Sequence, residues 1–210
     1  MKARHWRILA ALCVLVPLAG AAAAGKFWTM RGAQPFSDGE LDGVSVLSTG
    51  EMVLGPPVEK IEGLEANYVW DIAVGEGGEA YVGTGAPASV YVLREGALKL
   101  LHKTSEQHVQ SVLPLADGVV LAGTAPRGIV YRIDAEGKVS VFADLEENYV
   151  WDMARGPKGE IYCATGPNGR LLKLDDAGQA TEVLKVEQAN LLCLAVRAES
   201  GEVFVGTEPA

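Results

Sequence analysis

The sequence holds few of the residue types that form catalytic centres. Among its 210 residues are three histidines and three cysteines, and one of each lies within the first 24 residues. It contains no Gly-x-Ser-x-Gly nucleophile turn, no glycine-rich phosphate loop and no His/Cys cluster with metal-ligand spacing. The sequence therefore predicts no catalytic residue, no metal ligand and no bound cofactor, and it weighs against an enzyme.

Cysteine is also too scarce for a disulfide framework. Only Cys163 and Cys193 lie beyond the N-terminal segment, and a small exported domain stapled by disulfides uses more cysteines than this. Both fall inside expected strands, where a free cysteine behaves as a small apolar side chain. We expect two partly buried thiols.

Only one long apolar run is present, at the N-terminus. Lys2, Arg4 and Arg7 flank and precede an apolar stretch at 8–19 that is too short for a good membrane span, and small residues at 22–24 precede Gly25. This pattern predicts a signal peptide at 1–24 and an exported protein, periplasmic or extracellular, with no membrane span after cleavage. The alternative is an uncleaved N-terminal anchor.

Positive charge is in the minority. The formal net charge is −9, and the first 24 residues carry three basic and no acidic side chains, so residues 25–210 carry −12. Such an excess of negative charge argues against nucleic acid and anionic membrane surfaces as partners. It leaves a protein, a glycan or a small molecule as the expected partner.

What the sequence does contain is a repeat. Four related segments, the first reading VWDIAVGEGGEAYVGTG, begin 40, 41 and 41 residues apart at Val69, Val109, Val150 and Leu191. Threonines keep the same spacing at Thr84, Thr124, Thr165 and Thr207. A period near 40 residues, made of short apolar runs and glycine turns, is typical of β-propeller blades. We predict an all-β propeller of four-stranded antiparallel blades.

Each repeat is expected to form one four-stranded blade. In the first, β-rich runs at 69–74, 80–83, 90–93 and 98–101 alternate with glycine turns, which reads as an antiparallel meander. A column of small residues on the second strand predicts close approach by a neighbouring blade. Its members are Gly83, Gly123, Ala164 and Gly206.

The two ends of the repeat region are incomplete. Residues 25–43 are expected to be irregular, and 44–64, with strands at 44–47, 52–54 and 58–61, resembles the outer part of a blade. The last copy, 191–210, stops after its second strand. We expect about three complete blades, beginning at 69, 109 and 150, with partial blades at both ends of an open or truncated propeller. The alternative is a closed four-bladed ring in which 44–64 completes the last blade.

From residue 69 onward the chain resembles the bacterial exported β-propellers with NHL-, YVTN- or WD-like repeats. The resemblance rests on the runs VWDIAV and VWDMAR and on third strands such as GIVYRID at 128–134. It implies a fold and no particular ligand. Two Trp-Asp pairs look like the WD dipeptide, and they lie at the start of the first strand, at Trp70-Asp71 and Trp151-Asp152. In true WD repeats the dipeptide lies at the end of the third strand instead. We therefore interpret these two pairs as residues of blade packing or channel lining. The docking motif of quinoprotein propellers is absent, and no quinone cofactor is implied.

Polar side chains just before and within the first strands are the candidate ligand-binding residues, because these strand ends are expected to surround the mouth of a central channel. They are Asn67, Tyr68, Asp71, His108, Asn148, Tyr149, Asp152 and Asn190. Converging from several blades, they could bind a polar ligand or a divalent cation. They could equally be turn-forming residues that every blade needs. Glu146 and Glu147 are expected to lie solvated in a loop.

Three functions remain open on this sequence. The first is a non-catalytic binding or scaffold module with its ligand at the channel face. The second is a metal-dependent lactonase or hydrolase resembling the gluconolactonase-like propellers, which hold a channel metal with Asn, Asp and Glu side chains. The third is a truncated fragment without independent function.

Overall fold

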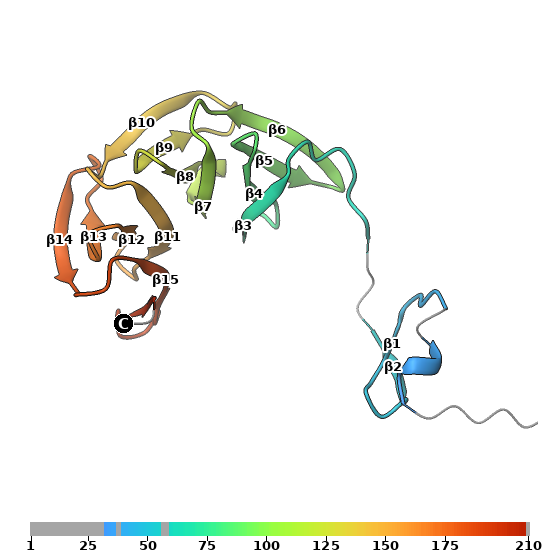
Figure 1. Cartoon of the computed structure of the whole chain (residues 1–210). Coiled ribbons are helices and arrows are strands. Elements are labelled where there is room, and N and C mark those ends of the chain that lie inside the picture. Colours follow the sequence, from blue (N-terminus) through green and yellow to red (C-terminus); the bar gives the residue numbers. More distant parts are fainter. Residues whose placement is uncertain (1–31, 37–38, 56–58, 209–210) are drawn as a thin grey trace, which may run out of the picture. The chain divides into compact units, whose positions relative to one another are not determined.

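The computed structural model describes residues 32–36, 39–55 and 59–208, and these residues fall into two compact units, 1–59 and 60–210 (Figure 1). The first unit holds the 3-10 helix η1 (Gln34–Phe36) and the antiparallel strands β1 (Val44–Val46) and β2 (Met52–Leu54). The strand expected at 58–61 is not formed over 59–61, and residue 58 lies outside the described part. The predicted signal peptide also lies outside it.

The second unit consists of strands that follow the repeat. The first blade comprises β3 (Tyr68–Val74), β4 (Ala80–Gly85), β5 (Ser89–Arg94) and β6 (Ala97–Lys103). The second comprises β7 (His108–Pro114), β8 (Val120–Ala125), β9 (Ile129–Ile133) and β10 (Val139–Asp144), with the 3-10 turn η2 (Ala116–Gly118) between β7 and β8. The third comprises β11 (Tyr149–Arg155), β12 (Ile161–Gly166), β13 (Arg170–Leu174) and β14 (Ala180–Lys185). Strands β15 (Leu191–Val196) and β16 (Val203–Thr207) form a two-stranded sheet.

The blades follow one another along an open arc (Figure 1). The first strands β3, β7, β11 and β15 lie on its inner side, and the fourth strands β6, β10 and β14 lie on its outer side. All pairings within the blades are antiparallel, and a single pair, Gly85 with His108, joins the first two sheets. The predicted class, a propeller of four-stranded antiparallel blades, is confirmed. In the described residues, no helix is long and apolar enough to cross a membrane.

Apolar side chains between neighbouring blades form the core. Tyr81 of the first blade packs with Val109 and Val112 of the second, and Leu121 of the second packs with Val150 of the third. All five are almost fully buried. Each buried side chain of this size contributes about 1.5–3 kcal/mol. The stability of one blade therefore depends on the blade beside it.

The column of small residues lies where blades approach most closely, as predicted. A Cβ atom added to Gly123 would lie 2.6 Å from Val150 Cγ1 in the next blade and 2.5 Å from Ser111 Oγ. A Cβ atom on Gly83 would lie 3.0 Å from Val109 Cγ1. The missing side chain at these positions makes room for the inner strand of the following blade.

The recurring threonines hold the turn between the second and third strands. The Thr124 hydroxyl donates to the Ile129 carbonyl, and that of Thr165 donates to the Arg170 carbonyl, each at 2.8 Å. Thr84 makes the same contact five residues along the chain. These threonines are fully buried. In the three complete blades, the regular spacing of the threonines therefore reflects a structural hydrogen bond.

Candidate functional site

The inner strands β3 and β11 each begin with a tyrosine that is followed two residues later by a tryptophan. We call the residues Tyr68, Trp70, His108, Tyr149, Trp151 and Asn190 the channel rim. In β3 and β11 a β-bulge falls at the tryptophan, because Val69 pairs with Thr84 and Asp71 with Gly83, which leaves residue 70 without a partner. A bulge redirects the side chain that it carries. The repeat thus places one indole at the start of the first and third blades.

At the junction of the first and second blades, the indole is tied to a histidine. Trp70 Nε1 donates to His108 Nδ1 at 3.1 Å, and the two rings meet edge to face with centroids 5.2 Å apart. Tyr68 lies beside both rings, with centroids at 6.1 and 6.5 Å. Because Nδ1 accepts this hydrogen bond, a neutral His108 carries its hydrogen on Nε2.

The junction of the third blade with β15 repeats this arrangement with other residues. Trp151 Nε1 donates to Asn190 Oδ1 at 3.0 Å, and Asn190 Nδ2 donates to Glu208 Oε2 at 2.9 Å. This chain of hydrogen bonds fixes the orientation of the amide. Tyr149 stacks on Trp151 with ring centroids 4.9 Å apart and planes inclined by 19°.

The two aspartates link the blades. Asp71 Oδ2 accepts a hydrogen bond from the Val112 backbone N–H at 2.7 Å, and Asp152 Oδ2 accepts one from Leu194 at 2.6 Å. Asp152 Oδ1 also accepts from Met153 N–H at 2.7 Å. Burial raises the pKa of Asp152; the two backbone donors oppose this effect, and the charge of Asp71 adds to it. Both carboxylates therefore already have partners within the fold.

The predicted site residues thus separate into groups. The tryptophans bring Tyr68 together with His108, and Tyr149 together with Asn190. Asn67 and Asn148 have exposed side chains, and their backbone N–H groups donate to the Ala86 and Gly166 carbonyls, where the second strand of the same blade ends. The tryptophans themselves were absent from the predicted site, although the repeated Tyr-x-Trp spacing marks both positions.

Two buried acids, Glu106 and Glu147, bind side chains of the turn and strand that follow in the same sheet or the next. Glu106 binds Arg127, with Arg127 Nε at 3.0 Å, and accepts from the Tyr131 hydroxyl at 3.2 Å. Glu147 accepts from Asn168 Nδ2 at 3.0 Å, and Arg170 Nε lies 3.2 Å from its other oxygen. The expectation that Glu147 is solvated is wrong, because these partners from the adjoining turn and strand replace water around its carboxylate.

The cysteines differ from each other. Cys163 is fully buried and Cys193 is exposed, and neither forms a disulfide bond. Burial raises the pKa of the Cys163 thiol to about 12, and the charge of Asp152 adds to this effect. The expectation of two partly buried thiols is therefore wrong for both, since neighbouring strands cover Cys163 completely whereas Cys193 lies on the last inner strand.

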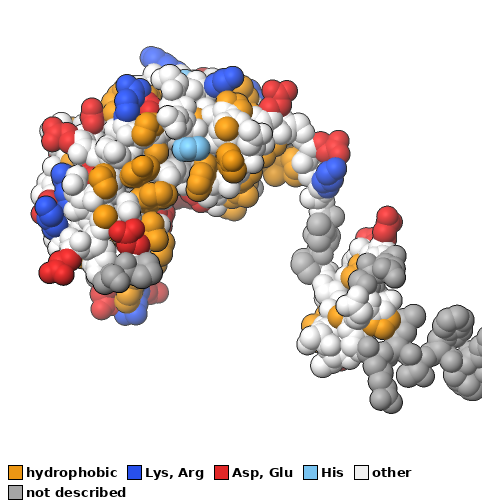
Figure 2. Space-filling model, in the orientation of Figure 1, with side chains coloured by type: hydrophobic (Ala, Val, Ile, Leu, Met, Phe, Trp, Pro, Cys, Tyr) orange, Lys and Arg blue, Asp and Glu red, His pale blue; other side chains and the backbone are white. Residues whose placement is uncertain are grey.

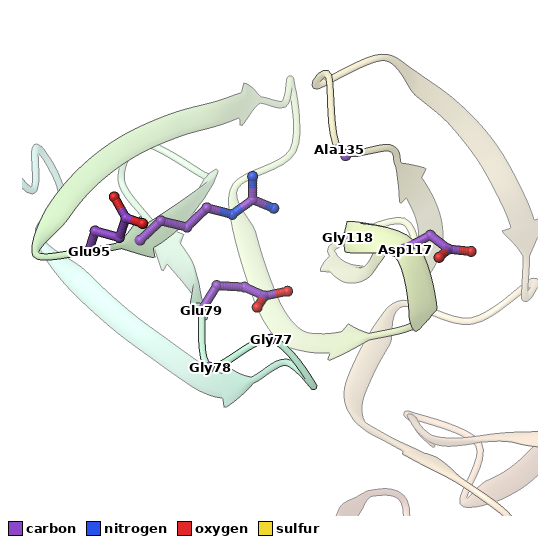
Figure 3. Close-up of a pocket in the computed structure, with 8 residues that line it drawn as sticks. Gly77, Gly78, Glu79, Glu95, Asp117, Gly118 and Ala135 are labelled. Carbon is purple, nitrogen blue, oxygen red and sulfur yellow. The ribbon is translucent and has the colours of Figure 1, made fainter.

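A cavity of about 400 Å³ lies away from the rim, among turns of the first and second blades (Figure 3). Glu79 points toward the turn that holds Gly118. The Tyr81 hydroxyl connects two of the charged groups there, since Oη lies 3.3 Å from Glu79 Oε1 and 3.4 Å from Arg94 Nη2. Across the described residues, no three His, Cys, Asp or Glu side chains gather as a metal site would need.

No protein-family model matches this chain, and no curated protein sequence does either. Solved β-propellers match it in structure. Virginiamycin B lyase from Staphylococcus aureus aligns with a TM-score of 0.57 and 13% identity over 80% of this chain and 63% of its own. The WD40 β-propeller domain of Doa1 aligns with a TM-score of 0.62 and 16% identity over 80% and 58%. A proposed gluconolactonase aligns with a TM-score of 0.58 and 14% identity over 77% and 62%.

This chain spans less than two thirds of the length of each of these structures. At such identities the likeness shows the fold alone, and the proteins that share it include enzymes as well as other modules. The repeat, the antiparallel blades and these likenesses agree with one another. The chain has the β-propeller fold.

Proposed function

We propose that this chain is a non-catalytic binding module whose ligand, an extended segment of another protein, contacts the channel rim. The observation that carries the proposal is the exposure of Tyr68 and Trp70 beside His108 at the start of the inner strands. Large exposed aromatic side chains are enriched at sites of protein recognition. Figure 2 shows further hydrophobic side chains gathered along the inner edge of the arc.

The hydrogen bonds at the rim favour binding over chemistry. Each indole N–H donates to a side chain of the next blade, which fixes the ring; the Trp70 side chain stays 45% exposed, whereas Tyr149 stacks on Trp151. The carboxylates of Asp71 and Asp152 are occupied by backbone donors. The rim therefore presents a rigid aromatic surface to a ligand. Its side chains are already fixed, so they lose little conformational entropy when the ligand binds. As part of the same proposal, we infer from the leader-like segment at 1–24 a location in the periplasm or outside the cell.

A peptide array and a glycan array, probed with the purified protein, test the proposal. We expect peptide binding that Trp70→Ala and Trp151→Ala each weaken by roughly thirtyfold, the effect of losing an interface residue that contributes about 2 kcal/mol. Leu100→Ala on the outer strand β6 is the control, because that side chain is exposed and distant from the inner strands. Equal binding by all four proteins, or binding to glycans alone, would contradict the proposal.

The hydrolase remains the competing function, because the chain shares its fold with a proposed gluconolactonase. Metal analysis separates the two. A stoichiometric divalent ion that is lost in Asp152→Ala would favour the hydrolase. A rim that binds peptide equally well with and without a chelator would favour the binding module.

A further inference from the structure

The second blade departs from its neighbours at the position of the rim tryptophans. Trp70 and Trp151 are each the second residue of their copy of the repeat, and the second residue of the copy between them is Gln110. The same β-bulge falls at this position, and it leaves residue 110 without a partner on β8. The second blade therefore places a carboxamide where the first and third blades place an indole.

The carboxamide of Gln110 is buried with an unpaired oxygen. The residue is 6% exposed, and its Oε1 atom finds no hydrogen-bond donor among the described residues. The indole nitrogens of Trp70 and Trp151 each donate to a side chain of the next blade instead. At that place in the blade after Gln110 lies Tyr149, whose ring stacks on Trp151. Native proteins leave few buried acceptors unpaired, because such an atom has given up its hydrogen bonds to water.

His108, two residues before Gln110 on β7, supplies the complementary group. Residues two apart on a strand share one face. The rings of Tyr68 and Trp70 show that a bulge at the second residue preserves this arrangement, since their centroids lie 6.1 Å apart. The Trp70 indole donates to His108 Nδ1, so the neutral imidazole carries its N–H at Nε2. Strand β7 thus carries a donor and an acceptor on one face, between the aromatic pairs of β3 and β11.

We propose that Gln110 and His108 bind the main chain of the ligand segment, with Gln110 Oε1 accepting from a peptide N–H and His108 Nε2 donating to a peptide carbonyl. The Gln110 side chain turns out of its buried position to make this contact, and its unpaired acceptor thereby gains a donor. Every peptide group carries one donor and one acceptor, so this subsite recognises extended backbone of any sequence. The inference rests on the function proposed above. It concerns the middle of the arc, where a complete blade lies on either side of the second (Figure 1).

Gln110→Leu tests the subsite by two measurements. Calorimetric titration with the array peptide that the wild-type protein binds most tightly should show affinity weakened roughly tenfold, the effect of losing one hydrogen bond. The melting temperature should rise or stay unchanged, because an apolar group replaces a buried acceptor that has no partner. Gln179→Leu is the matched control, since this exposed glutamine lies in the turn before the outer strand β14. It should change neither quantity. Gln110→Met, unbranched like glutamine, repeats the test if leucine does not fit.

Methylating the nitrogens of the same peptide one at a time identifies the donor. At one position the methyl group should weaken binding to the wild-type protein roughly tenfold and leave binding to Gln110→Leu unchanged, because that variant has already lost the acceptor. Equal affinity of Gln110→Leu and wild type, a lower melting temperature in both Gln110 variants, or the absence of such a position would overturn this inference and leave the binding module standing. A wild-type protein that binds no peptide would overturn both.

Discussion

Replacing Gly123 with valine should destabilise the propeller by overfilling the junction between its second and third blades. Even the first added carbon would lie 2.6 Å from Val150 Cγ1 and 2.5 Å from Ser111 Oγ, which is closer than real Cβ atoms approach. Ser111 can rotate its hydroxyl away, but Val150 is fully buried and has no free space to enter. The third blade must therefore move away from the second.

Overpacking of this kind costs about 1–3 kcal/mol, and the two further methyl groups of valine place Gly123→Val near the upper value. For a domain of this size, about 3 kcal/mol corresponds to a fall in melting temperature of roughly 6–12 °C. Thermal unfolding followed by circular dichroism measures the fall directly.

Gly83 supplies the matched control, since it occupies the same column one blade earlier with its nearest neighbour at 3.0 Å. Gly83→Ala should therefore cost less than Gly123→Ala. In the double variant Gly123→Ala/Val150→Ala, the loss should be smaller than the sum of the two single losses, because the second substitution removes the atom that obstructs the first. An unchanged melting temperature in Gly123→Val would refute the packing register of the blades.

Three further predictions concern buried polar groups. Thr124→Val should lower the free energy of unfolding by about 1–3 kcal/mol in urea titrations, because the buried carbonyl of Ile129 loses its hydroxyl donor. A thiol reagent at pH 8 should modify Cys193 rapidly and Cys163 only after unfolding, because Cys163 is buried and its pKa is about 12; rapid modification of both would contradict the fold. Burial raises the pKa of Asp152 in the folded state, so the folded protein binds this proton more tightly than the unfolded chain does. The free energy of unfolding should therefore fall as the pH rises above 3.8, the ordinary pKa of this carboxyl group. Asp152→Asn should flatten that part of the curve of stability against pH.

Most of the fold could be predicted because each repeat contains all the strands and turns of one blade. Short apolar runs and glycine turns specify strands and their antiparallel pairing within about 40 residues, and the small column at Gly123 already indicated close approach. The strand expected at 58–61 is the exception over 59–61. It lies outside the repeat, so no recurring pattern supported it.

The candidate site was less accessible to sequence reasoning, because its partners come from different blades. Trp70 and His108 are 38 residues apart, and Trp151 and Asn190 are 39 apart. Only the stacking of blades brings them into contact. Because the blades stack, Asp71, which the sequence suggested as a ligand-binding residue, instead accepts a hydrogen bond from the Val112 backbone N–H.

The sequence alone determined the architecture, since strand and turn preferences act between neighbouring residues and the period repeats them. Tertiary structure alone decided which equivalent side chains are covered. Val69 and Val150 occupy the same place in the repeat, yet one is half exposed and the other fully buried. Val150 is buried because Leu121 of the second blade packs with it, and only the assembled arc brings these two strands together.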